Sequence, residues 1–173
     1  MRDGNTMLQI VDLKNLVAAI GDAVVVSDVE GLITLWNPAA ERIFGFSQAE
    51  ALGQSLDLIT PERQRQRHWD GYAKTMRTGE TRYGTEVLRV PAVHKDGRPL
   101  SIAFTVGLLF DADSKVTGIA ALIRDDTKRW NDERQLRRRL NELESQFASL
   151  SCGAREARSP AEPGADFPGA SII

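Results

Sequence analysis

The segment from Pro61 to Tyr83 carries the residues best suited to chemistry. It reads PERQRQRHWDGYAKTMRTGETRY, and its apolar side chains recur at helical spacing, as Trp69, Tyr72, Ala73 and Met76. On a helical wheel His68 lies roughly 90° from the centre of this stripe, at its edge beside Tyr72. An imidazole at this position is either a ligand for a metal-bearing cofactor or a surface or helix-capping residue.

Enzymatic activity is not expected. Candidate acids are present at Asp28, Glu41, Asp70 and Glu86. No histidine or nucleophile stands in a recognisable relation to them. The chain also has no Gly-rich phosphate loop, no metal-ligand cluster of Cys and His, and no kinase or cyclase motif after its charged C-terminal helix. If the chain is complete, its output is expected to be physical contact.

The stretch from Asp28 to Ser47 predicts the frame that positions this segment. The β-branched run 23–26 and the run 32–36 flank a turn at Glu30-Gly31, which predicts a β-hairpin. Asn37 precedes Pro38, a pair typical of a helix N-cap and first helical position. Apolar residues at helical spacing follow until Gly45, which predicts the end of that helix.

Three more strands are predicted downstream. The third begins near Thr85 and ends at a turn over residues 94–97, and the fourth, Pro99 to Phe110, alternates apolar and smaller residues with a period of two. The fifth, Val116 to Ile123, is rich in small residues. Small side chains at a sheet centre leave room either for a ligand or for a tightly packed neighbouring element, and both alternatives are open.

The chain divides into four predicted parts. Residues 1–21 contain an N-terminal amphipathic helix, with apolar residues from Leu8 and Val11 to Ile20, which packs on the sheet or on a second subunit. Residues 22–127 form the domain, residues 128–151 a charged helix, and residues 152–173 a tail rich in Gly, Pro, Ala and Ser that is expected to be disordered.

The charged helix carries a seam for dimerisation. Its apolar residues are spaced +4, +3, +4, +3, as Leu136, Leu140, Leu143, Phe147 and Leu150. Two heptads of this kind supercoil two helices, although so short a seam needs the domain or a partner to hold it. The alternative is a helix that folds back on its own domain.

Charge and composition favour a soluble, cytoplasmic protein. The 173 residues include 22 basic and 24 acidic ones, a net charge of −2, so membrane and nucleic acid are not expected as partners. Between 128 and 139 six basic residues face two acidic ones, a local balance of +4, but a solvated dimer helix is preferred over a phosphate-binding one. No signal peptide or membrane-spanning run is present, and the single cysteine, Cys152, forms no internal disulfide.

Taken together, the motifs from about residue 12 to 127 resemble those of a PAS domain. The first half matches as Asp28-x-x-Gly31-x-Ile33-x-x-x-Asn37-x-x-Ala40-x-x-x-Phe44-Gly45, continued by Ser47, Glu50 and Leu52-Gly53. Lys95-Asp96-Gly97 and Arg124-Asp125-Asp126-Thr127 look like later landmarks of the family. The resemblance implies an α+β PAS fold: a five-stranded antiparallel sheet with helices on one face, plus flanking N- and C-terminal helices. It also implies a sensory, signal-transducing module that dimerises and contacts a signalling partner.

The stretch 67–72, with Thr78-Gly79-Glu80, resembles the haem-binding oxygen sensors among PAS kinases. There a histidine before an acidic residue and a tyrosine is the proximal iron ligand, which implies haem b on His68. Two departures are visible. The histidine of those sensors stands three residues before the tyrosine, a place held here by Trp69, and the position of their oxygen-binding arginine falls on Leu88, with Arg89 next to it.

Several ligands are compatible with this resemblance. The residues expected to contact a cofactor are His68, Trp69, Tyr72, Met76, Leu88, Ile102, Phe104, Ile119 and Ala121. The domain has no cysteine, which excludes the covalent flavin and yellow-chromophore photocycles, whereas a noncovalent flavin stacked on an aromatic ring is compatible but less favoured. The leading expectation is either an unknown small ligand, such as an apolar metabolite, or an empty, well-packed core. The alternatives are a haem-based gas or redox sensor and a PAS-type transcriptional regulator or interaction module without a cofactor.

Overall fold

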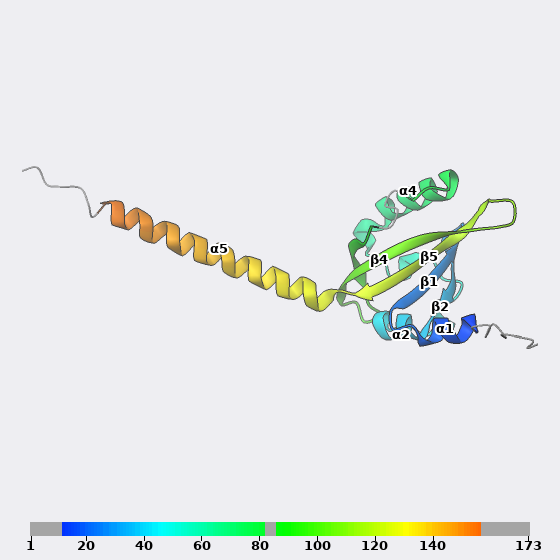
Figure 1. Cartoon of the computed structure of the whole chain (residues 1–173). Coiled ribbons are helices and arrows are strands. Elements are labelled where there is room, and N and C mark those ends of the chain that lie inside the picture. The colour runs from blue at the N-terminus through cyan, green and yellow to red at the C-terminus, as the bar shows by residue number, and fades with distance from the viewer. Residues whose placement is uncertain (1–11, 82–85, 157–173) are drawn as a thin grey trace, which may run out of the picture. The chain divides into compact units, whose positions relative to one another are not determined.

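The computed structural model describes residues 12–81 and 86–156, with side chains as far as residue 147. Its centre is a five-stranded antiparallel sheet in the order β2-β1-β5-β4-β3 (Figure 1). The strands are β1 (Ala23–Asp28), β2 (Ile33–Trp36), β3 (Leu88–Val93), β4 (Pro99–Phe110) and β5 (Val116–Asp125). The predicted α+β class with a five-stranded antiparallel sheet is confirmed.

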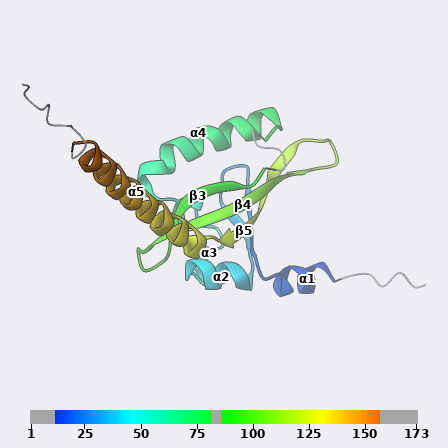
Figure 2. The ribbon, with the colours of Figure 1, turned by 60° about the vertical axis from the view of Figure 1, so that its left-hand side comes forward.

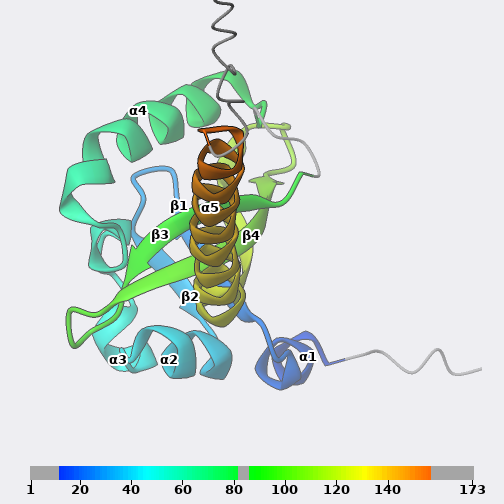
Figure 3. The ribbon, with the colours of Figure 1, turned by 90° about the vertical axis from the view of Figure 1, so that its left-hand side faces the viewer.

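Helices account for most of the remaining chain. They are α1 (Leu13–Ala19), α2 (Pro38–Phe44), α3 (Gln48–Ala51), the 3-10 turn η1 (Leu56–Leu58), α4 (Glu62–Thr78) and α5 (Thr127–Glu156). Figure 3 shows α2, α3 and α4 following one another in an arc around the sheet, and Figure 2 shows α4 running beside β3 and β4. The chain divides into two compact units, one through Trp130 and one from Asn131 onward.

The core lies on the sheet face that α2 and α3 cover. The largest fully buried side chains are Trp36 and Ile33 of β2 and Phe44 of α2, and the rings of Trp36 and Phe44 lie 5.3 Å apart. Alternate residues of the strands, such as Val25 and Ile102, complete this cluster because successive side chains of a strand point to opposite faces. We call this face the inner face and the opposite one the outer face.

Asn37 joins the hairpin to α2 at a buried corner. Its Oδ1 accepts hydrogen bonds from the backbone N–H of Val24 at 2.9 Å and of Ala40 at 3.0 Å. Its Nδ2 donates to the carbonyls of Val17 and Asp22, both at 3.1 Å. The predicted helix cap is therefore confirmed, but the same amide also holds the strand β1 and the segment that precedes it.

Gly118 shows why the fifth strand contains a glycine. A Cβ built at this position would lie 2.3 Å from the backbone oxygen of Ser27 on β1, far inside contact distance. Close approach of two strands, and not space for a ligand, therefore explains this small residue. A Cβ at Gly107 on β4 would meet nothing within 4 Å, so the requirement is local to the contact between β1 and β5.

Several predicted boundaries differ from the structure. The strand β3 begins at Leu88, whereas the expected start near Thr85 falls within residues 82–85, which are outside the described part. The strand β5 continues to Asp125, two residues further than expected. α1 begins after Asp12, whose carboxylate accepts hydrogen bonds from Lys14 and Asn15 N–H, whereas the expected contributions of residues 8 and 11 lie outside the described residues.

The C-terminal helix is longer than predicted. α5 continues to Glu156, so the expected boundary at residue 151 and the disorder expected from residue 152 are wrong for residues 152–156; the remainder of the predicted tail lies outside the described residues. Ala154, Arg155 and Glu156 are good helix formers and offset the single Gly153. Within residues 12–81 and 86–156, no helix has the length and apolar content that a membrane crossing requires.

Candidate functional site

The helix α4 presents a different face to the sheet from the one that apolar spacing predicts. Tyr72 is buried, Met76 and His68 are half-buried, and Ala73, which the predicted stripe includes, is exposed. His68 and Tyr72 are four residues apart and so lie one above the other on one face of the helix. The prediction for Ala73 is wrong because the polar contacts of Tyr72, and not apolar area alone, set the rotation of α4.

The Tyr72 hydroxyl attaches α4 to β1. It donates a short hydrogen bond to the carbonyl of Asp28, and the Ser27 hydroxyl lies 2.9 Å from it. Because the phenolic proton is already given to Asp28, Ser27 acts as donor to the Tyr72 oxygen. Burial raises the pKa of Tyr72, so the phenol keeps the proton that this arrangement needs.

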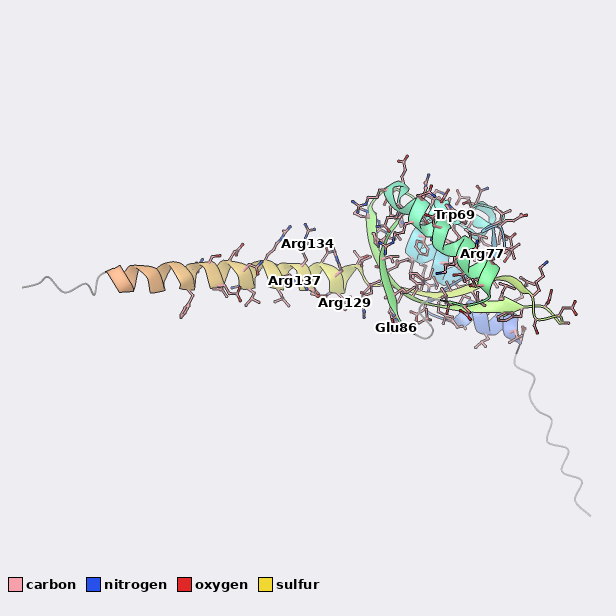
Figure 4. All side chains as sticks on the ribbon, turned by 90° about the horizontal axis from the view of Figure 1, so that it is seen from above. Trp69, Arg77, Glu86, Arg129, Arg134 and Arg137 are labelled. Carbon is pink, nitrogen blue, oxygen red and sulfur yellow. The ribbon has the colours of Figure 1, made fainter. Side chains whose placement is uncertain are left out.

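Trp69 forms the second attachment of α4. Its indole Nε1 donates to a carboxylate oxygen of Asp57 at 2.9 Å, and Arg65 reaches the same carboxylate at 3.7 Å. The indole ring lies over the turn at Gly31, where an added Cβ would stand 2.3 Å from it. Gly31 therefore serves both the hairpin turn, with φ of +81°, and the seat of Trp69, which Figure 4 labels on α4.

His68 lies between these two attachments. Its ring contacts Trp69 in an edge-on arrangement, with centroids 5.0 Å apart, and lies 6.0 Å from the ring of Tyr72. Its Nε2 is buried and has no hydrogen-bond partner in the described part of the chain. His68 is thus neither a surface residue nor a helix cap, and its unpaired nitrogen is available to a bound group.

Burial sets the charge of His68. It lowers the pKa of the imidazole, and the nearby Asp57 carboxylate opposes this shift only in part. The ring is therefore neutral at neutral pH, the form that coordinates a metal or accepts a hydrogen bond. Among the described residues no group of three His, Cys, Asp or Glu side chains gathers as a protein metal site would require.

The remaining predicted contact residues share the inner face of the sheet. Leu88 pairs with Phe104 across β3 and β4, and Ile119 pairs with Ser27 across β5 and β1. Leu88, Phe104, Ile119 and Ala121 are half-buried, whereas Ile102 belongs to the buried core. These side chains form an apolar surface next to the polar group of His68, Tyr72 and Ser27.

Arg89 does not contribute to this surface. Alternation along β3 puts Leu88 on the inner face and Arg89 on the outer face, where its Nε lies 3.6 Å from Asp126. A hollow of about 360 Å³ lies elsewhere, between the start of α4 and the β3–β4 hairpin, and is bordered by Pro61, Pro91 and Pro99.

Sequence reasoning missed two partners of this site, Ser27 and Asp57. Ser27 resembles a polar residue at a strand end, and Asp57 lies in a short 3-10 turn with no recognisable motif. Their roles depend on the position of α4, because Tyr72 and Trp69 of this helix are the residues that contact Ser27 and Asp57. The alternation of β1 does assign Ser27 to the same face as Val25, and this is the one local signal that could have found it.

The geometry defines a class of protein: a small α+β domain that surrounds one sheet face with helices. A family model described as the PAS fold matches residues 12–125. The chain therefore belongs to the PAS family, and it is a signal-sensing module. The expectation drawn from the motifs between residues 28 and 127 is confirmed.

Relatives and solved structures agree with this assignment. The chain is 33% identical over 141 residues to the sensor protein FixL of Bradyrhizobium diazoefficiens, and 24% identical over 131 residues to the sensor histidine kinase TmoS of Ectopseudomonas mendocina. These matches cover 80% and 76% of the chain but only 26% and 13% of the two relatives. The chain thus spans about a quarter or less of these longer sensors.

Two solved structures share the fold. The PAS domain of a protein from Colwellia psychrerythraea has a TM-score of 0.59 at 22% identity, covering 67% of this chain and 95% of that one. An RNA-binding light-oxygen-voltage receptor has a TM-score of 0.59 at 21% identity, covering 79% of this chain and 37% of that one. At these identities the likeness establishes the fold.

The charge state of His68 predicts a dependence of stability on pH. Its pKa in the folded domain is below the ordinary value of 6.5, so the unfolded chain binds a proton more readily than the folded one. The free energy of unfolding should therefore decrease as the pH falls from 7.5 through 6.5 to 5.5. Urea unfolding of His68→Gln should show a weaker decrease than the wild type.

The neighbouring variant Arg67→Gln is the control, because Arg67 is exposed and keeps its charge over this range. It should follow the wild-type pH dependence. Parallel curves for the wild type and His68→Gln would contradict the buried, neutral state of His68.

Proposed function

We propose that this chain is the sensory part of a signalling protein, which binds a small ligand beneath α4 and signals by changing how its flanking helices pair with those of a second copy. The observation that carries the proposal is the seam of α5. Its members in the described part are Leu136, Leu140, Leu143 and Phe147, and each of these residues is between 55% and 75% exposed.

An exposed apolar stripe at heptad spacing supports a helical partner. Water contact with four large apolar residues is unfavourable, and a second copy of α5 would cover them by knobs-into-holes packing. The ion pair between Arg137 and Glu133, with atoms 3.1 Å apart, lies along the helix on its polar side. The fifth predicted member, Leu150, lies in the helix, and its side chain is outside the described residues.

The proposed ligand site is the apolar inner face beside His68, Tyr72 and Ser27. A ligand there would gain from burying Leu88 and Phe104 and from satisfying the unpaired His68 nitrogen. The proposed output is contact without chemistry, passed to a further domain or a separate signalling protein in the cytoplasm. Two longer relatives of this chain, FixL and TmoS, are sensor proteins, and this supports the proposal.

The α5 seam can be tested by charge substitution. The double variant Leu140→Glu/Leu143→Glu would face four carboxylates toward each other in a paired dimer, so its dimer should dissociate at least tenfold more readily than the wild type. Sedimentation equilibrium of the full chain measures this change.

Asn141→Glu is the matched control because residue 141 lies on the opposite side of the helix and is exposed. It should retain the wild-type dimer. An unchanged mass for the double variant would remove the seam from the mechanism.

A second candidate function is a haem-based gas or redox sensor, favoured by the buried and unpaired Nε2 of His68. The residues fit such a group on one side: His68 would hold it through the unpaired nitrogen, and Leu88, Phe104 and Ile119 would offer it an apolar surface. When bound, haem would supply a site for a diatomic gas or an electron. Arg89 points to the outer face, so β3 offers no cationic donor to a bound gas.

A stacked flavin gains no support from Trp69, because its ring already contacts Gly31 and its indole nitrogen donates to Asp57.

Reconstitution with haemin distinguishes this candidate from a colourless ligand. The wild type should show a Soret band that is shifted or lost in His68→Ala and retained in His94→Ala, since the His94 side chain lies at the β3–β4 turn beside Gly45 and Asp96. A wild-type spectrum equal to that of free haemin would exclude the haem function and leave the dimer proposal intact.

A further inference from the structure

A row of alternating charges crosses one end of the sheet on its outer face. It consists of Asp22, Arg124, Asp126 and Arg89, and we call it the charge row. Asp22 immediately precedes β1, Arg124 lies near the end of β5, Asp126 follows β5, and Arg89 lies on β3. The charge row therefore links the segment before β1, the segment between β5 and α5, and the strand β3, which also carries Leu88.

The first link of the charge row is a bidentate ion pair. The Nε and Nη2 of Arg124 lie 3.0 and 2.7 Å from the two carboxylate oxygens of Asp22. Two parallel hydrogen bonds of this kind fix the direction of the guanidinium as well as its position. Since the main-chain carbonyl of Asp22 also accepts from Asn37, this link reaches the corner of the fold.

The second link holds Asp126. Its carboxylate lies 3.6 Å from the Nε of Arg89 and accepts hydrogen bonds from the Nε of Arg129, at 2.7 and 2.9 Å. Only 12% of the Asp126 side chain is exposed. Arg129 belongs to the first turn of α5 and is labelled in Figure 4.

Arg124 lies on the same sheet face as Arg89, and its charge acts on Asp126 as well as on Asp22. In the sheet register Arg89 is opposite Ala103, and Ala103 is opposite Arg124, so the two arginines lie on the same face, one on each side of β4. Ala103, which lies between them in the register, carries only a methyl group. Arg129 lowers the pKa of Asp126 most, against the opposing effect of burial, and the charges of Arg89 and then Arg124 lower it further.

Asp126 also immediately precedes α5. Its N–H donates to the carbonyl of Ser101 at 2.8 Å, and its own carbonyl accepts from Trp130 N–H at 2.9 Å. The neighbouring Thr127 hydroxyl accepts from Ser101 N–H at 3.0 Å. A change in the partners of the Asp126 side chain therefore acts directly on the first turn of the helix.

From this arrangement we infer that the charge row is an exchange switch between two pairings of Arg124. In the described pairing, Asp22 holds Arg124 while Arg89 and Arg129 hold Asp126. Displacement of Arg89, which adjoins the candidate ligand contact Leu88, removes one of the two cations beside Asp126 while Arg129 stays. Arg124 then takes the place of Arg89 and leaves Asp22. The exchange couples β3 to the first turn of α5 and to the segment before β1. The inference rests on the proposed function, because the exchange is the route by which the proposed ligand site would regulate the flanking helices.

The coupling can be measured without knowing the ligand. Asp22 and Arg89 are three strand spacings apart, roughly 14 Å, and residues this distant normally contribute independently to stability. Each exposed pair alone adds little stability, so the informative quantity is the departure from independence. Urea unfolding of the full chain is measured for the wild type, Asp22→Asn, Arg89→Gln and the double variant.

The unfolding equilibrium constant of the double variant should differ by about threefold or more from the product of the two single effects. The control cycle pairs Asp22→Asn with Arg98→Gln, which removes another exposed Arg–Asp pair, that with Asp96 at 3.3 Å. That cycle should be independent within about twofold. Independence of Asp22 and Arg89 to the same limit would overturn the inference.

Hydrogen exchange gives a second readout that follows the helix itself. In Asp22→Asn, the amides of Asp126 and Trp130 should exchange at least threefold faster than in the wild type, although neither contacts Asp22 through a hydrogen bond. Unchanged rates would also overturn the inference. A dimer that fails to form would instead count against the proposed function, because both measurements of the charge row hold for a monomer.

Discussion

The structure depends most on the side-chain amide of Asn37. This amide is 3% exposed, and each of its hydrogen-bonding positions is used: two backbone N–H groups on one atom and two carbonyls on the other. A buried amide satisfied in this way costs little to bury and is expensive to disturb, because four backbone groups would lose their partners together. Through it, the hairpin, α2 and the end of α1 meet at one corner. The ion pair of Asp22 with Arg124 then extends that corner to β5 and so to the beginning of α5.

The two sides of the domain are held by different interactions. Around Trp36 and Phe44 the core is apolar and closely packed, whereas α4 is attached mainly through the polar contacts of Tyr72 and Trp69. Elements with few buried apolar contacts open at lower free energy than the core does. This difference fits the proposed function, in which α4 would respond to a ligand beside His68 while the corner keeps the sheet intact. The charge row on the opposite face then offers a path from β3 to the flanking helices.

Local sequence signals predicted the parts of the fold that local physics determines. Asn37-Pro38 and Gly45 bound α2 as expected, and the alternation of residues 99–110 gave β4 with its observed limits. What could not be predicted depends on partners distant in sequence. The rotation of α4 follows from the contacts of Tyr72 with Ser27 and Asp28, and the need for Gly118 follows from the approach of β1. Asp57 and Asp22 carry no motif, so their roles became visible only once the strands and α4 were assembled. His68 was predicted as a candidate ligand from its residue type, but the burial of its ring was not predicted from the sequence.

The measurement that tests this account most directly compares Asn37→Ser with Asn37→Ala by urea unfolding. A serine restores the cap of α2 but reaches neither Val24 nor the carbonyls of Val17 and Asp22. The account predicts that Asn37→Ala loses about 3 kcal/mol of unfolding free energy and that Asn37→Ser recovers only about 1 kcal/mol of this loss. If Asn37→Ser were within about 0.5 kcal/mol of the wild type, Asn37 would be a helix cap alone, and the corner would not be what holds the fold together.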